Sequence, residues 1–234
     1  MKPRKILKSL SVAAISCAII TGMTGCMQKN KLSVSACVSY MKEKYGTDFT
    51  LVEKGELTSS TLEIYVESPE YKGEKILVME ERLNKGEKLI FHDNFLCVKY
   101  HEQTKKMAEK MAEEVYGECK VLCEVNNFNV QPDEFDNTTT FEEFCSKRES
   151  RIWVEILLPA DHSLSDKENE LKQLEQLCLE NRFACICDVY YADDADAYRK
   201  ISTHEELMDY GIWYSVAGKF LVDNDFTNFV ETWR

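Results

Sequence analysis

Four histidines each stand beside an acidic residue, a pairing that could supply general acid–base catalysis. The pairs are His92 with Asp93, His101 with Glu102, His162 with Asp161, and His204 with Glu205. A histidine acts as a base when a carboxylate lies within hydrogen-bond distance and orients its ring. Neighbours in a strand or helix point in different directions, and with 41 acids in the chain such adjacency is common. The spacing therefore favours structural roles for these histidines.

Two cysteines at alternate positions, Cys185 and Cys187, could contribute thiolates to a metal or redox site. Alternate residues of a strand lie on one face, roughly 7 Å apart, which is too far for an easy disulfide. A zinc site would need a second pair such as Cys119 and Cys123, and the spacings miss the usual Cys-x(2–4)-Cys pattern on at least one side. The apolar neighbours favour core packing, so we predict neither a metal site nor a cofactor.

Other site motifs are incomplete or absent. A calcium loop needs alternating oxygen ligands, a glycine and a closing glutamate, and the acidic cluster after residue 187 lacks the last two. That cluster, Asp188, Asp193, Asp194 and Asp196, is better explained as a solvated loop before a helix. The sequence holds no Gly-rich phosphate loop, Gly-x-Ser-x-Gly or His-Glu-x-x-His motif. We therefore predict no catalytic residues and a protein that is not an enzyme.

The amino terminus has the pattern of an export signal. Lys2, Arg4, Lys5 and Lys8 precede an apolar run, and no acid occurs before Cys26. The apolar stretch 10–23 is interrupted by polar residues and is shorter than the ~20 residues of a spanning helix, which disfavours a retained membrane anchor. An ordinary cleaved signal remains the alternative, although its cleavage motif would be Ala-x-Ala.

The ending Met23-Thr24-Gly25-Cys26 resembles the lipobox of bacterial lipoproteins, with Met where Leu is more usual. The resemblance implies that residues 1–25 are a signal peptide and that Cys26 is the lipidation site, thioether-linked to a diacylglycerol. It also implies that residues 26–33 form a tether and that the protein lies on the extracytoplasmic face of the cell membrane. Two acyl chains suffice for stable anchoring.

Composition limits the partners of the exported part. Without residues 1–25, which hold four of the 29 basic residues and none of the 41 acids, the formal charge is about −16. Such an acidic surface disfavours nucleic acid and anionic lipid headgroups as partners.

The eight cysteines after Cys26 have mostly apolar neighbours. We expect them to be buried and mostly reduced, and the sequence allows one or two disulfides among them.

Hydrophobic periodicity predicts an α+β fold with mixed or antiparallel sheets and alternating helices, in one or two small subdomains. Helices are expected at 34–45 and 102–116, and a capping box predicts another from Ser165. Strands are expected at 61–67, 75–79, 95–100, 119–125, 151–158, 184–191 and 219–222. The polar segment 126–140 is the best candidate for a boundary, giving an N-terminal half at 34–128 and a C-terminal half at 140–234. The sequence leaves open whether these are one domain.

Two functions remain compatible with these observations. The stretch Tyr40–Phe49 is similar to uncharacterised lipoproteins of Gram-positive anaerobes, a resemblance that implies no activity. We expect a membrane-anchored lipoprotein that binds an unknown protein or small molecule without catalysis. The alternative is an exported enzyme with an unrecognised Cys/His or carboxylate site.

Overall fold

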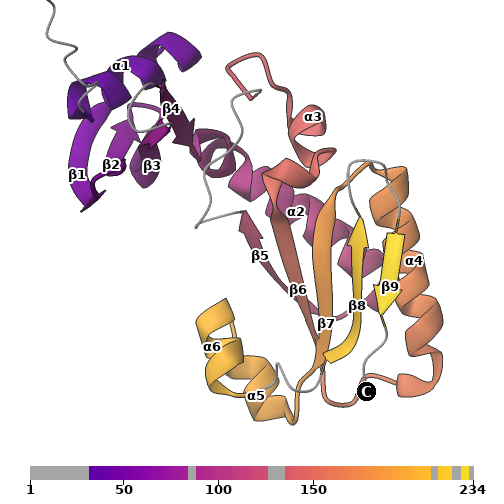
Figure 1. The fold of residues 1–234 in the computed structure, drawn as a ribbon. Helices are drawn as coiled ribbons and strands as arrows, with labels where there is room; N and C mark the ends of the chain where they lie inside the picture. Colours follow the sequence, from indigo (N-terminus) through magenta and orange to yellow (C-terminus); the bar gives the residue numbers. More distant parts are fainter. Residues whose placement is uncertain (1–31, 84–87, 126–134, 212–215, 223–227, 232–234) are drawn as a thin grey trace, which may run out of the picture.

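The computed structural model describes residues 32–83, 88–125, 135–211, 216–222 and 228–231, which form two β-sheets connected by one long helix (Figure 1). The first sheet is antiparallel, and its strands lie in chain order. It comprises β1 (Thr50–Leu57), β2 (Thr61–Ser68), β3 (Tyr71–Leu83) and β4 (Lys88–Asp93), preceded by α1 (Val34–Tyr45) and followed by α2 (Phe95–Tyr116).

The second sheet is mixed and also lies in chain order. Its strands are β5 (Lys120–Val125), β6 (Ile152–Leu158), β7 (Cys185–Tyr191), β8 (Val216–Val222) and β9 (Asn228–Glu231). Only β6 and β7 run parallel, and the other neighbours are antiparallel. The α+β fold class with mixed and antiparallel sheets is therefore confirmed. The remaining elements are α3 (Phe141–Cys145), η2 (Arg148–Ser150), η3 (Leu164–Asp166), α4 (Lys167–Glu180), α5 (Ala195–Lys200) and α6 (His204–Asp209).

The first sheet packs one face against α1. Alternate residues of β2 are buried, as expected for a strand with one face on the core. On α1 the buried residues are Cys37, Met41 and Tyr45, at spacings of four that place them on one side of the helix. Gly46 ends α1 at φ 69°, a left-handed conformation that glycine adopts without steric cost. The predicted helix 34–45 is confirmed.

The predicted strand at 95–100 is wrong, because α2 begins at Phe95. Its buried residues Leu96, Tyr100 and Thr104 recur every four positions, and the same face continues through Ala108 and Met111. The apolar run 95–98 therefore belongs to the helical stripe that was predicted only from residue 102. Buried Asp93 accepts a hydrogen bond from the Phe95 backbone N–H and so satisfies a free donor of the first turn.

The helices cover the second sheet unequally. Inward residues of β5, β6 and β7 such as Cys123, Val154 and Cys187 share a core with α2 and α4. On the opposite face, a smaller core joins the sheet to α5 and α6, formed by Leu122, Leu157, Tyr190, Ala192, Ala197, Ile201 and Leu207. We call this opposite side the outer face. Beyond α6, the outer face of the second sheet carries polar and half-buried side chains.

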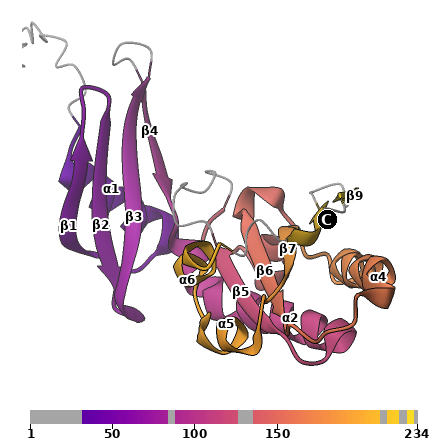
Figure 2. The ribbon, with the colours of Figure 1, turned by 90° about the horizontal axis from the view of Figure 1, so that it is seen from below.

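The two sheets lie beside one another, connected through α2 (Figure 2). One continuous set of buried side chains runs from the first sheet along α2 into the second. The predicted boundary segment 126–140 falls between β5 and β6, which pair with each other, so the second sheet joins β5 of the predicted N-terminal half to strands of the C-terminal half. Residues 1–31, with the predicted signal peptide, Cys26 and most of the predicted tether, lie outside the described residues. Within the described ranges, no helix is both long enough and apolar enough to span a bilayer.

Candidate functional site

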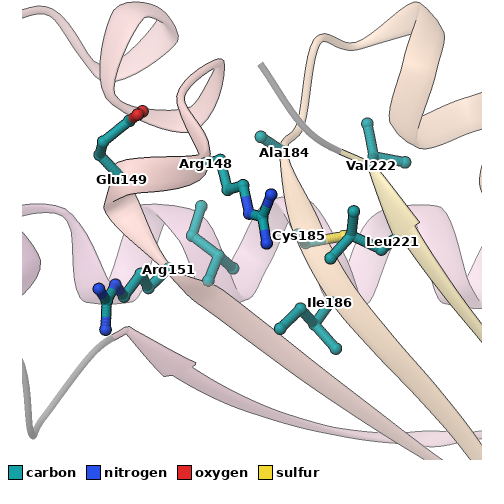
Figure 3. Close-up of a pocket in the computed structure, with 9 residues that line it drawn as sticks. Arg148, Glu149, Arg151, Ala184, Cys185, Ile186, Leu221 and Val222 are labelled. Atoms are coloured by element: carbon teal, nitrogen blue, oxygen red, sulfur yellow. The ribbon is translucent and has the colours of Figure 1, made fainter. Parts of the chain in front are cut away.

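A cavity of about 530 Å³ opens at the edge of the second sheet where β6 and β7 begin and β8 ends (Figure 3). Its described lining is mainly apolar, with charged side chains contributed by the turn before β6. The apolar residues are Ile152, Ala184, Cys185, Ile186, Leu221 and Val222, and the charged ones are Arg148, Glu149 and Arg151. A cavity of this size falls in the range of small-molecule sites.

Hydrogen bonds of the buried residue Ser150 hold the turn that carries the charged residues. Ser150 is fully buried, and its hydroxyl donates to the carbonyl of Phe144 in α3. Its backbone N–H donates to the carbonyl of Lys147 over 3.0 Å. Arg151 then adopts φ 49°, and this left-handed residue redirects the chain into β6. The position of Arg148 at the cavity is therefore fixed by the backbone of η2.

The charged side chains take different directions. Arg148 extends toward Cys185 and Leu221, whereas Arg151 and Glu149 point away from it (Figure 3). A guanidinium is permanently charged and presents a planar set of donors that matches a carboxylate. One such group, that of Arg148, lies among the mainly apolar residues that line the cavity.

Next to the cavity, the outer face carries a polar row of three residues in register, Glu155, Asp188 and Lys219. The side chains of Glu155 and Asp188 are each only 3% exposed. Asp188 accepts hydrogen bonds from the Trp153 indole over 2.8 Å and from Lys219 over 3.3 Å. Glu155 lies 2.7 Å from Nδ1 of His204, the first residue of α6. Both buried carboxylates are therefore paired with a base that reaches solvent.

The pKa values of both Glu155 and His204 are shifted by burial and by their pairing. Burial raises the pKa of Glu155, and the hydrogen bond with His204 offsets part of that rise. Burial alone would lower the pKa of His204, but its bond to Glu155 and the nearby charges of Glu155, Glu124 and Glu205 raise that pKa above its usual value. The fold therefore favours a protonated His204 beside Glu155.

We expect this pair to make stability depend on pH. Because the pKa of His204 is higher in the fold than in the unfolded chain, its stabilisation is complete below about pH 6.5 and is lost as pH rises through the folded value. The raised pKa of Glu155 acts in the same direction. The free energy of unfolding, measured with urea at pH 6 and pH 8, should fall with rising pH, and Glu155→Gln should flatten that fall.

Glu81→Gln is the matched control for this measurement. Glu81 also faces a histidine, but its oxygen lies 3.9 Å from Nε2 of His92 and its side chain is 39% exposed. The control should retain the pH dependence of the wild type. An unchanged slope in Glu155→Gln would contradict the role assigned to the His204–Glu155 pair.

Two other histidines, His92 and His162, also contact carboxylates that are not their neighbours in sequence. His162 lies 3.2 Å from Glu170, and His92 lies 3.9 Å from Glu81. For His92, His162 and His204 the carboxylate contacted is therefore not the neighbour in sequence. One signal in the sequence could have predicted the buried carboxylates of the outer face. A single acid inside an apolar strand indicates a buried carboxylate, and a buried carboxylate needs a partner. Glu155 and Asp188 both occupy such positions.

The cysteines after Cys26 are all free thiols, seven buried and Cys119 half-buried. Cys178, Cys185 and Cys187 lie together against α2, and burial raises the pKa of the Cys187 thiol. The pKa of Cys123 rises to about 12 for the same reason. Protonated thiols are poor nucleophiles and metal ligands. Within the described residues, no three His, Cys, Asp or Glu side chains are grouped to hold a metal.

The acidic loop after β7 serves as a helix start. Asp194 accepts hydrogen bonds from the backbone N–H groups of Asp196 and Ala197, and so caps α5. Asp196 pairs with Arg199 and Lys200 along the same helix. The prediction of a solvated loop leading into a helix is confirmed for Asp194 and Asp196 but is wrong for Asp188, which is buried within β7.

No protein-family model and no curated protein matches the sequence. Among solved structures, the chain is similar to a DUF5037 family protein from Ruminococcus gnavus ATCC 29149. The two share 14% identity over 80% of this chain and 90% of the other, with a TM-score of 0.40. A likeness of this extent carries no argument about function.

Proposed function

We propose that this chain is a lipid-anchored extracytoplasmic protein that binds a small ligand in the cavity beside Arg148 and does not catalyse a reaction. The observation that carries the binding role is the cavity of about 530 Å³, whose described lining residues are mainly apolar. The lipobox-like residues ending at Cys26 support the anchored role.

Anchoring would hold the start of the fold near the membrane. Seven residues lie between Cys26 and Val34, the first residue of α1, so the two are eight residue steps apart. Because an extended chain spans at most ~3.6 Å per residue, this tether reaches at most about 30 Å. The start of the fold is itself fixed, because the backbone N–H of Ser33 donates to the carboxylate of Glu80 in β3. The start of α1 would therefore lie within about 30 Å of the outer surface of the cell membrane.

Filling the cavity should remove binding without altering the core. Ile186 lines the cavity and is half-buried on the outer face, so Ile186→Trp adds bulk there. We expect calorimetric titration with octanoate, octylammonium and monomeric octyl glucoside to show that every probe bound by the wild type binds at least tenfold more weakly to Ile186→Trp.

Val52→Trp provides the control, since Val52 is 48% exposed on β1 of the first sheet. It should bind the probes like the wild type. The proposed site is wrong if none of the probes binds the wild type, or if Ile186→Trp binds them unchanged.

An exported enzyme remains the second candidate because of one contact. His204 Nδ1 lies 2.7 Å from Glu155, the arrangement in which a carboxylate orients a general base. Neither residue belongs to the described lining of the cavity. A ligand seated on the His204 ring would favour this candidate over the binding role.

A further inference from the structure

We infer that the turn between β1 and β2, residues 57–61, rests on the surface of the bilayer that holds the anchor, with the Leu57 side chain between headgroups and acyl chains. This inference rests on the anchored role in the proposed function and goes beyond it, because it gives the fold an orientation on the membrane. Three observations carry it: where the tether joins the fold, what the turn exposes, and how the turn is held.

The tether joins the fold at the end of the first sheet that carries this turn. The backbone N–H of Ser33 donates to the carboxylate of Glu80 in β3. Glu80 pairs in register with Leu62 of β2, and Leu62 pairs with Leu57 of β1. Neighbouring strands lie about 4.8 Å apart, so Leu57 is roughly 10 Å across the sheet from the residue that holds Ser33. The β1–β2 turn can therefore reach the bilayer in which Cys26 would be anchored.

The turn exposes an apolar side chain and no charge. Leu57 is 69% exposed, more than any other large hydrophobic side chain in the part of the chain that the structure describes. Residues 58–60 are also exposed and carry only hydroxyl groups. The β2–β3 turn, at the opposite end of β2, contains the charged Glu70 instead (Figure 2). Because an apolar side chain gains from leaving water and a charged one loses, the β1–β2 turn is the better suited to meet lipid.

Hydrogen bonds hold the turn in one shape. The backbone N–H of Thr58 donates to the Thr61 carbonyl over 2.8 Å, and the Thr58 hydroxyl accepts from the backbone N–H groups of Ser60 and Thr61. From β3, Arg82 donates its backbone N–H to the Ser60 carbonyl over 2.6 Å and its guanidinium to the Ser59 carbonyl over 3.3 Å. These backbone groups are already paired, so lipid contact does not leave them without a partner.

Charge favours a zwitterionic lipid surface as the partner. Without residues 1–25 the chain has a formal charge of about −16, which opposes contact with anionic headgroups. The turn adds no charge of its own, and its hydroxyls can hydrogen-bond the oxygens of lipid headgroups. A phosphatidylcholine surface therefore matches the turn.

Tryptophan fluorescence in vesicles measures the contact. The lipidated chain is reconstituted into phosphatidylcholine vesicles with and without bromine on the acyl chains, because bromine quenches a nearby indole. Leu57→Trp adds an indole at the turn, and the signal of the wild type, which has three tryptophans, is subtracted. We expect brominated lipid to reduce the added emission at least about twofold, since interfacial apolar groups lie ~5–10 Å into the boundary between headgroups and acyl chains.

Val52→Trp is the matched control, because Val52 is 48% exposed on the same strand but lies five residues, roughly 17 Å, from Leu57. Its added emission should be the same in both kinds of vesicle. Equal quenching of the two variants, or no quenching of either, would overturn the inferred orientation while the chain is still anchored. A wild-type chain without lipid on Cys26 would instead overturn the anchored role itself.

Hydrogen exchange provides a second measurement that needs no substitution at Leu57. The lipidated chain in phosphatidylcholine vesicles is compared with the unlipidated mature chain mixed with the same vesicles. Amides of residues 57–61 should exchange at least about twofold more slowly in the lipidated chain, and those of residues 68–71 should exchange equally in both. Unchanged exchange at residues 57–61 would contradict the inference, and this result decides if Leu57→Trp does not fold.

Discussion

Replacing Asp93 with alanine should lower the free energy of unfolding by about 3–5 kcal/mol, as expected when one partner of a buried ion pair is removed. Asp93 is fully buried where β4 meets α2, and Lys44 of α1 reaches it over 2.8 Å with a side chain only 7% exposed. Tyr40 and Tyr45 donate their hydroxyls to the same carboxylate over 2.8 and 2.7 Å. Burial and the charge of Asp93 raise the pKa of Tyr45, which keeps that donor protonated.

The alanine variant would leave a buried ammonium and two hydroxyls without their acceptor. Urea unfolding at neutral pH measures the loss, and Asp93→Asn should lose less because it keeps one acceptor oxygen. The matched control is Glu53→Ala, which breaks an exposed pair with Lys75 at 2.6 Å and should change stability by less than about 1 kcal/mol. A loss of similar size in Asp93→Ala and Glu53→Ala would show that the buried network does not hold α1 to the sheet.

Replacing Cys26 with alanine should abolish lipidation entirely. Mass spectrometry of the wild-type membrane fraction should find a mature chain that begins at Cys26 and carries a diacylglycerol. The variant should lack the lipid mass and retain residues 1–25, because the thioether requires the Cys26 thiol. High salt should not release the wild type, since two acyl chains hold it by the hydrophobic effect and its acidic surface makes no attraction to anionic headgroups.

The leader contains its own control in Cys17, a second cysteine within the apolar run. Cys17→Ala should be lipidated and processed like the wild type. An unlipidated wild-type amino terminus would contradict the anchoring proposal and the extracytoplasmic location derived from it.

The spacing of apolar residues along the sequence is sufficient to predict helices and strands that have one buried face. The spacing of Cys37, Met41 and Tyr45 predicts α1, and the alternation along residues 61–67 predicts β2, because each pattern repeats over several turns or pairs. The segment 95–100 is different. Its short apolar run fits a strand or a helix, and the capping bond from Asp93 depends on tertiary placement.

The candidate site could not be predicted in the same way. Its lining comes from η2, the starts of β6 and β7, and the end of β8, segments separated by up to about 70 residues. Arg148 lies in a polar stretch without periodicity, so nothing local distinguishes it from a solvated arginine. The pairing of His204 with Glu155 is equally remote, although a lone acid within an apolar strand indicates that a partner must exist.

The most direct test of the proposed ligand site is a crystal structure of the mature chain soaked with octanoate. We expect octanoate in the cavity, with its alkyl chain against Ile186 and Leu221. Octanoate bound elsewhere, with the cavity holding only solvent, would contradict the account. Octanoate on the outer face beside His204 would favour the enzyme candidate instead.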